Sequence, residues 1–466
     1  MRARKIFLLL FILLFGATVE TAWRVRSHVE LGPLGWRVLG GRFYGPSFDF
    51  TETQTIQVPA GAKVVVLNSF GGVKLVKGEA GEVRAALRKV VFLPTQGDAQ
   101  TLAGRVKLRA VVDGSTLTLS TNRGDLEREG ALDQAGLETH WEVAVPEATT
   151  AQVNNEHGRI DVSDVAGAEV EGSFEPIAVE RVAGDAKVKG SHADVTISSI
   201  GGALTLSGRH GDLGVRDVTG RANVDAEHGN VRAERVGGLT LSLKHGDLEA
   251  DTVRGDAEVH GEHSAARISD VSGAVHVETS FDDVHLARVA GEARVKTEHG
   301  AVEAKDVQGA VTVEATFDDV SLSSVGGHAD VKVDHGGLHA RSLAKGATVH
   351  ASGDDVTLEG FRGGARIVAS RGSVRLVPDE AINEPISVTA EHGGIALEVP
   401  PGSRFDLQAS AKPGNVSVSV SDFTASESGA SRVTGRVGPG GSAVTLEAQH
   451  GDVTVEPRGH STSRED

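Results

Sequence analysis

A repeat of about 18 residues constrains the fold of this chain more than any other feature of its sequence. Thirteen positions, mostly His or Phe, follow one another in ten steps of 18 residues and two steps of 17. Such spacing indicates a repeat architecture, in which each unit buries its apolar face against its neighbours. The positions are His157, Phe174, His192, His210, His228, His245, His263, Phe281, His299, Phe317, His335, Gly353 and Arg371.

Each unit has the pattern of two short strands joined by turns. In the unit of residues 210–227, apolar and polar residues alternate over 213–215 and again over 222–226. This period of two indicates strands with one face turned inward and one turned outward. The Asp-Val-Thr-Gly stretch at 217–220 predicts a turn between the two strands.

Two arrangements of these strands are compatible with the pattern, antiparallel hairpins and a parallel solenoid with one coil per repeat. The recurrence of identical residues at fixed offsets favours the solenoid, and the Asn-Gly dipeptides that suit hairpin turns are scarce. The first residue of the predicted turn never carries the same charge in two adjacent units, as expected if like charges would otherwise stack. Along the chain this residue is Asp164, Arg181, Ser199, Asp217, Arg235, Thr252, Asp270, Arg288, Asp306, Ser324, Ser342 and Gly360. We therefore predict an all-β fold, a parallel β-solenoid of 18-residue, two-strand coils.

The composition agrees with narrow coils and excludes several kinds of chemistry. The chain has 59 Gly and only 4% aromatic residues, while 39% of its residues are hydrophobic. Because Cys is absent, disulfides, iron–sulfur clusters, thiol catalysis and cysteine-ligated zinc are excluded. The net charge of −17 argues against a nucleic-acid partner, which requires a basic face.

The N-terminus has the pattern of an export signal. Arg2, Arg4 and Lys5 precede an apolar run at residues 6–19. This run suits either a cleaved signal peptide or an uncleaved membrane anchor, because a small-x-small cleavage motif is missing. In both cases the charge bias sends the rest of the chain across the membrane. We expect an exported protein, periplasmic or at the cell surface and tethered at the inner membrane if the helix stays attached. A buried apolar helix is the remaining alternative.

The pattern changes along the chain and divides it into segments. A Val-Pro dipeptide opens three regions, at residues 58, 145 and 399. Terminal repeats of solenoids are atypical because they cover open edges. The predicted segments are a signal peptide or anchor at 1–22, a juxtamembrane linker at 23–50, an N-terminal capping β region at 51–155, the regular array at 156–371, a C-terminal solenoid or cap at 372–457 and a disordered tail at 458–466.

The same motifs carry a resemblance to a known family. A signal or anchor helix, the Val-Pro opening, Asn-Ser-Phe-Gly-Gly-Val at residues 68–73 and the stacked His-Gly-Asp-Val and Asp-Val-x-Gly units resemble a bacterial adhesin-like family. Its members are envelope repeat domains of unassigned biochemical function, and some relatives are encoded with envelope-stress regulators. The resemblance covers residues 51–457 and implies a parallel β-solenoid outside the cytoplasmic membrane. It brings no catalytic residues to this chain.

A ladder of histidines is the first candidate for chemistry. Imidazoles in consecutive coils can bind transition metals or respond to pH near 6.5. Phe replaces His in other units, however, and counting by two along the strand places this position on the core-facing side. We therefore expect a half-buried stack of rings at a corner, with metal binding and pH sensing as the alternatives. The ladder consists of His192, His210, His228, His245 and His263.

A ladder of acids two residues further along is the second candidate. Calcium could bridge such carboxylates, although the short Gly-rich repeats of calcium-binding β-rolls are absent. Asp at a turn more often accepts hydrogen bonds from nearby backbone. The ladder consists of Asp194, Asp212, Asp247, Asp283, Asp319 and Asp355, with Asn230 in line.

The chain shows no pattern that indicates catalysis. Its units are short and uniform, and it has no phosphate-binding loop, nucleophile elbow or His-Glu-x-x-His motif. We predict no catalytic residues and no cofactor. The expected function is a non-enzymatic structural or adhesin-like module of the cell envelope, which presents a polar acidic ladder to a protein or glycan partner. The alternatives are a membrane-tethered envelope-stress sensory or regulatory module and a polysaccharide-active enzyme.

Overall fold

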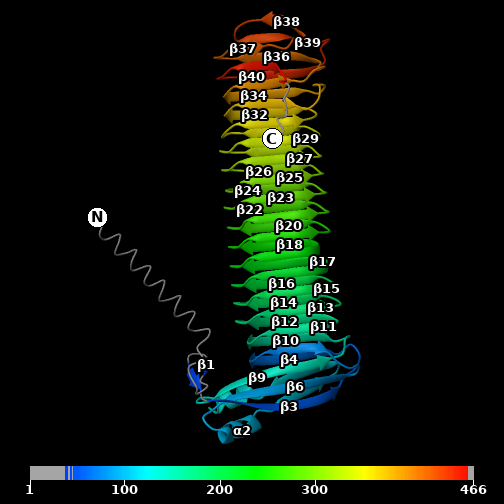
Figure 1. Cartoon of the computed structure of the whole chain (residues 1–466), viewed down its shortest axis with the longest axis vertical. Helices are drawn as coiled ribbons and strands as arrows, with labels where there is room; N and C mark the ends of the chain where they lie inside the picture. The colour runs from blue at the N-terminus through cyan, green and yellow to red at the C-terminus, as the bar shows by residue number, and fades with distance from the viewer. Residues whose placement is uncertain (1–36, 40–41, 45, 460–466) are drawn as a thin grey trace, which may run out of the picture. The chain divides into compact units, whose positions relative to one another are not determined.

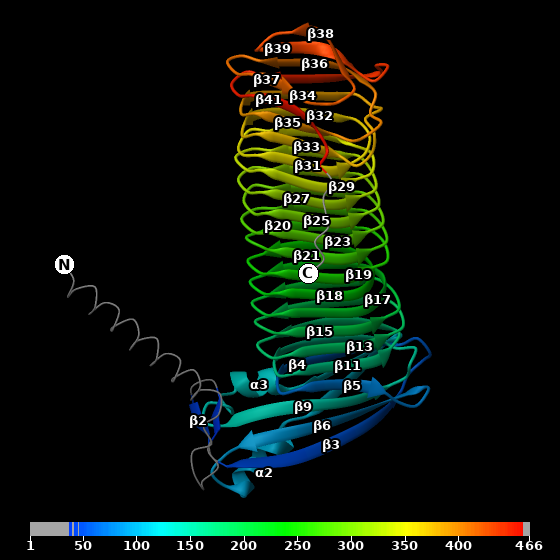
Figure 2. The ribbon, with the colours of Figure 1, turned by 45° about the horizontal axis from the view of Figure 1, so that its top comes forward.

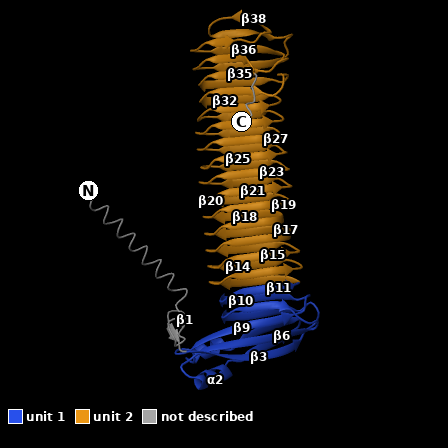
Figure 3. Ribbon diagram, in the orientation of Figure 1, with its two compact units in different colours: residues 1–165 blue, residues 166–466 orange. Residues whose placement is uncertain are grey.

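The computed structural model describes residues 37–39, 42–44 and 46–459 of the chain. The predicted signal or anchor at 1–22 and most of the segments at 23–50 and 458–466 lie outside these residues. The chain forms two compact units, residues 1–165 and 166–466 (Figure 3). None of the helices in the described ranges is both long enough and apolar enough to cross a membrane.

The first unit combines antiparallel and parallel strands. One series of neighbours is antiparallel from β3 (Ser47–Gln57) to β6 (Glu82–Phe92) and β9 (Gly136–Val145), then parallel to β5 (Val73–Lys77) and β11 (Ile160–Val165). A second series is antiparallel from β7 (Leu108–Asp113) to β8 (Thr116–Thr121), then parallel to β4 (Lys63–Phe70) and β10 (Thr150–His157). The remaining strands are β1 (Arg37–Leu39) and β2 (Arg42–Tyr44), which pair antiparallel.

Two short helices cover part of the first unit, α2 (Gln96–Arg105) and α3 (Arg123–Arg128). The helix α2 begins after Thr95, whose hydroxyl oxygen accepts a hydrogen bond from the backbone of Asp98 at 3.2 Å. Its apolar face is buried against Val91 and Leu137. The unit therefore has a small core of its own beside the helices.

The second unit is a stack of coils, and each coil contributes one strand to each of two columns (Figures 1 and 2). The first column holds β13 (Ile177–Val182), β15 (Val195–Ile200), β19 (Leu248–Val253), β21 (Ala266–Val271), β23 (Val284–Val289), β25 (Val302–Val307), β27 (Val320–Val325), β29 (Leu338–Leu343), β31 (Val356–Phe361), β33 (Val374–Pro378), β35 (Ile395–Val399), β41 (Val453–Pro457) and β37 (Val416–Val418). The second holds β12 (Gly167–Ser173), β14 (Ala186–Ser191), β16 (Leu204–Arg209), β20 (Ala257–Glu262), β22 (Val275–Thr279), β24 (Ala293–Thr297), β26 (Val311–Ala315), β28 (Ala329–Val333), β30 (Ala347–Ala351), β32 (Ala365–Arg371), β34 (Ile386–His392), β40 (Ser442–Ala448) and β36 (Phe405–Ala411). Two longer strands, β17 (Leu213–Glu227) and β18 (Val231–Lys244), run through both columns.

The pairing within each column is parallel and follows the sequence repeat. Val195 pairs with Leu213, and Ala257 pairs with Val275, each one repeat further along. The predicted parallel β-solenoid is therefore confirmed, and the hairpin alternative is wrong for the array. In the second unit, antiparallel pairs join β36 to β39 (Arg432–Val437) and β39 to β38 (Phe423–Ser428), at the end of the stack.

The core lies between the two columns and is built from Val, Leu, Ile and Ala. In one coil, Val195, Ile197 and Ile200 of β15 and Leu204 and Leu206 of β16 are all at most 1% exposed. Aliphatic side chains of this size fill a narrow interior, because neighbouring coils lie only about 4.8 Å apart. The scarcity of aromatic residues follows from this geometry.

The predicted turn at residues 217–220 is wrong. The strand β17 continues through these residues, and Val218 is fully buried. The reason is the backbone of Asp217, whose φ of 55° is left-handed and resets the alternation, so that the next side chain points inward. The same bend recurs with positive φ at Arg181, Ser199, Arg235, Thr252, Asp270, Arg288, Asp306, Ser324, Ser342 and Gly360.

The end of the chain returns into the stack. The strand β40 pairs with β34 on one side and with β36 on the other, although β36 precedes it in the sequence. In the other column β41 lies between β35 and β37 in the same way. The final strands therefore form an internal coil, and β36 with the β38–β39 hairpin covers it.

Candidate functional site

The second unit carries a column of stacked rings, which we call the ring column. Adjacent ring centroids are 4.3–5.5 Å apart, and the planes of four consecutive His pairs are inclined by 2–29°. Parallel stacking at this spacing results from one ring per coil. The ring column consists of Phe174, His192, His210, His228, His245, His263, Phe281, His299, Phe317 and His335.

The predicted stack exists, but its predicted half-buried position is wrong for most of its members. The five consecutive histidines, from His192 to His263, are exposed, and Phe174, Phe281 and Phe317 are 56%, 49% and 47% exposed. The φ angles of these residues are 53–73°, so the left-handed backbone at the corner turns each ring outward. The rule that every second residue of a strand faces the same side no longer holds after a residue with left-handed backbone.

The ring column is poorly arranged for chelation. An imidazole nitrogen binds a metal in the plane of its own ring, and two parallel planes 4.7 Å apart, as in His192 and His210, cannot aim at one ion without turning. Throughout residues 37–39, 42–44 and 46–459, no three His, Asp or Glu side chains surround a point that would hold a metal ion. Metal binding by these rings therefore stays a prediction.

The acid ladder forms hydrogen bonds between coils. Asp194 Oδ1 accepts a hydrogen bond from the backbone N–H of Asp212 at 3.0 Å, and Asp212 does the same for Asn230 at 2.9 Å. Asn230 Oδ1 in turn accepts from the N–H of Asp247 at 3.0 Å. The bonds from Ala301, Gly337 and Ser373 to Asp283, Asp319 and Asp355 are 2.9, 2.8 and 2.6 Å long. These six side chains, the whole ladder except Asp247, each accept a hydrogen bond from the backbone of the next coil, which is a structural role.

Charges at the bend of the first column pair between coils, as their order along the sequence indicated. Arg235 donates two hydrogen bonds to Asp217, at 2.6 and 3.1 Å, and Arg288 donates two to Asp270, both at 2.6 Å. These hydrogen bonds lower the pKa of both carboxyl groups from their ordinary value. The side chains of these pairs are 41–56% exposed, so we assign them a role in setting register rather than a large contribution to the free energy of folding.

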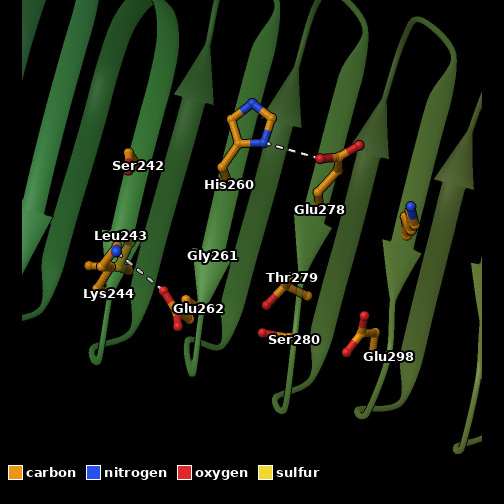
Figure 4. A pocket seen from close by; sticks show the side chains of 11 residues that line it. Ser242, Leu243, Lys244, His260, Gly261, Glu262, Glu278, Thr279, Ser280 and Glu298 are labelled. Atoms are coloured by element: carbon orange, nitrogen blue, oxygen red, sulfur yellow. Dashed lines mark ion pairs between the residues drawn. The ribbon is translucent and has the colours of Figure 1, made fainter.

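A shallow hollow of about 340 Å³ lies on the outer face of the second column (Figure 4). Two ion pairs border it, Lys244 with Glu262 and His260 with Glu278, each at 3.4 Å. The sequence patterns did not single out His260 or Glu278, because neither belongs to a ladder of like residues. That His260 and Glu278 lie opposite each other on neighbouring strands could be found only by aligning two repeats and comparing the outward-facing residues of each.

Comparison with known proteins identifies the family to which the repeats of this chain are similar. The family model described as Toastrack DUF4097 matches residues 38–314 and 267–456, which together span most of the chain. This match confirms the resemblance to β-solenoid repeats of unassigned biochemical function. Curated proteins gave no match in sequence. A crystal structure of a candidate cell adhesion protein from Clostridium sporogenes ATCC 15579 matches with 7% identity and a TM-score of 0.15, over 88% of this chain and 100% of that one. A TM-score this low carries no argument.

Proposed function

The chain belongs to the Toastrack DUF4097 family, and from that premise we propose that it is a non-enzymatic, adhesin-like interaction module of the cell envelope. The observation that carries the proposal is the regular spacing of polar side chains on a hydrogen-bonded scaffold. Each coil presents its outward positions in register with those of the coil before it, so side chains from successive coils stand in rows. A repetitive surface of this kind suits a repetitive or extended partner.

We further propose that the partner is an envelope protein or glycan that recognises the acidic face. In the acid ladder Asp194 and Asp212 lie one coil apart and the carboxylates from Asp212 to Asp355 lie two coils apart, on a chain whose net charge is −17. The Toastrack β-solenoid is a non-catalytic type of fold, which supports a binding role. Export by the N-terminal segment is part of this proposal and rests on its sequence pattern alone.

The acid ladder allows a test that separates charge from fold. Asn230 occupies the ladder and accepts the same inter-coil hydrogen bond as its Asp neighbours. Replacing Asp194, Asp212, Asp283, Asp319 and Asp355 together by Asn therefore removes charge and keeps the acceptors. We expect this variant to melt like the wild type and to lose most of its co-sedimentation with envelope fragments of its source cells.

A control for the position of the charge replaces two exposed carboxylates outside the ladder, Glu303 and Glu314, by Gln, and is compared with the Asp194→Asn, Asp212→Asn variant in the same assay. If the ladder variant and the wild type co-sediment with envelope fragments to the same extent, recognition of the acidic face is refuted. N-terminal sequencing of the membrane fraction addresses the regulatory alternative. An intact N-terminus there would favour a tethered sensory module over a released adhesin.

A further inference from the structure

Two histidines and two glutamates form a square on the outer face of β20 and β22. The strands are in register, with Glu258 opposite His276 and His260 opposite Glu278. Alternate residues of a strand point to the same face, so all four side chains project outward together. Their side chains are between 36% and 49% exposed, which leaves their donor atoms accessible to a small ion. We call these four residues the His–Glu square.

The donor atoms of the square already lie close to one another. Glu278 contacts both imidazoles, at 3.4 Å from His260 Nδ1 and 3.5 Å from His276 Nε2. Glu258 lies 3.4 Å from His260 Nε2. A tetrahedral Zn²⁺ ion with bonds of about 2.0–2.1 Å separates neighbouring ligand atoms by about 3.3–3.4 Å. Each of the two contacts made by Glu278 thus has about the spacing of neighbouring ligand atoms around zinc.

The surroundings leave one side of the square open to a cation. On the β18 side the neighbouring outward residues are neutral, Thr240 and Ser242. On the β24 side they are Arg294 and Lys296, which balance part of the acidic charge. Figure 4 shows His260 and Glu278 at the border of the hollow, with Glu262 and Glu298 further along it. Access from the hollow therefore passes Glu262 and Glu298, together with Lys244 and Lys296, which also line it.

We propose that His260, His276 and Glu278, supported by Glu258, bind a divalent transition-metal ion. As the side chains stand, no three of them surround one point in the described residues, so binding requires rotation of the two rings about their side-chain torsions. The ring centroids of His260 and His276 are 6.2 Å apart and the rings meet edge to face, so they are not held against each other in a parallel stack. Two imidazoles with carboxylate suit Zn²⁺, Ni²⁺ or Cu²⁺, whereas Ca²⁺ takes oxygen ligands only.

Calorimetric titration of the full chain with ZnCl₂ tests the site. We expect one saturable binding event that Ca²⁺ neither reproduces nor displaces. His260→Gln and His276→Gln should each weaken it at least about tenfold. The matched control is His350→Gln, because His350 occupies the equivalent position of β30 but pairs with Lys332 and Val368. This control should leave the titration unchanged.

Two further measurements keep the test decisive. A variant with Gln in place of His192, His210, His228, His245 and His263 should still bind zinc like the wild type. Loss of zinc binding in this variant would show that the ring column holds the ion and would overturn the proposal. Co²⁺ should give the intense visible absorption of tetrahedral coordination in the wild type and not in His260→Gln. No zinc binding by the wild type, or binding unchanged in the His260→Gln, His276→Gln double variant, would also overturn it.

Discussion

Contact between coils is close where a ring-column histidine is followed by glycine, as at residues 210, 228, 245, 299 and 335. At His228 the backbone is left-handed, and a Cβ added to the next residue, Gly229, would lie 2.1 Å from the carbonyl oxygen of Gly211. Real Cβ atoms do not approach a backbone atom so closely, so the backbone of this coil requires glycine at position 229. The His-Gly dipeptides of the sequence follow from this contact.

Gly229→Ala should therefore destabilise the protein. The added methyl group has to separate two coils at a hydrogen-bonded corner, and overpacking of this kind costs about 1–3 kcal/mol. The matched control is Gly214→Ala, because Gly214 faces outward and its added Cβ would approach nothing closer than 3.9 Å. In urea unfolding, the midpoint should fall for Gly229→Ala and stay or rise for Gly214→Ala. Equal behaviour of the two variants would contradict the argument.

The ion pairs at the bend predict a specific pH dependence. Arg288 lowers the pKa of Asp270, so the ionised carboxylate favours the folded state. This contribution is present above the ordinary carboxyl pKa and is lost as pH falls through the lowered one. Asp270→Asn keeps a residue that tolerates the left-handed backbone and removes the charge. At pH 7 this substitution should lower the urea midpoint slightly, and the decrease should be smaller at high salt. At a pH below the pKa of the carboxyl groups the midpoint should not change. A difference from the wild type that persists in acid would refute this origin.

The residue scale also shows where prediction from sequence stopped. The inward positions of the strands followed from their alternation, as with Leu213 and Val215. Ile200 was misassigned to a turn and the rings to a half-buried corner, because Ser199 and His192 have left-handed backbones. Assigning every second residue to the same face assumes that the backbone is extended throughout the strand. The presence of Ser or His in the sequence does not by itself indicate a positive φ. The His–Glu square was missed for a different reason, since it depends on register between two coils.

At the scale of elements, the C-terminal coil is the least expected feature. The sequence predicted a C-terminal solenoid or cap at 372–457, which contains the strands β40 and β41. Their insertion between β34 and β36 was not predictable, because like strands of a solenoid offer nearly equivalent partners. Only the complete set of contacts at the end of the stack selects one order.

This insertion makes the end of the chain essential to the stack. A chain ending at Gly440 would lack β40 and β41, and β36 and β37 would lose their parallel neighbours. We expect such a chain to unfold at a clearly lower temperature and to aggregate through the uncovered edge. A chain ending at Gly459 keeps both strands and should melt like the wild type. A normal melting curve for the shorter chain would show that β36 can pair directly with β34.

At the scale of the whole array, the second unit is stabilised by the same contacts in each coil. A coil touches mainly its two neighbours, so stability is close to a sum of coil and interface contributions. The ladders of Asp, of rings and of paired charges all follow one register, which explains how so few aromatic residues and no Cys suffice. The period was predictable because every coil repeats it, whereas the ends of the array had to be observed.

A deletion of one whole repeat should therefore be tolerated, and a deletion of half a repeat should not. Removing residues 301–318 joins Gly300 to Asp319 and restores a His-Gly-Asp-Val junction. Strand β24 would then meet β28 in the register it now has with β26, and Asp319 would donate its N–H to Asp283 as Ala301 does now. Circular dichroism per residue should be unchanged and the melting temperature lowered only slightly. Removing residues 301–309 joins two strands of the second column directly to each other. Every later strand would then have to lie in the column opposite to the one it now occupies. This deletion should abolish cooperative melting. Similar melting of the two deletions would show that the array tolerates a change of phase and that its stability does not depend on like positions stacking in register.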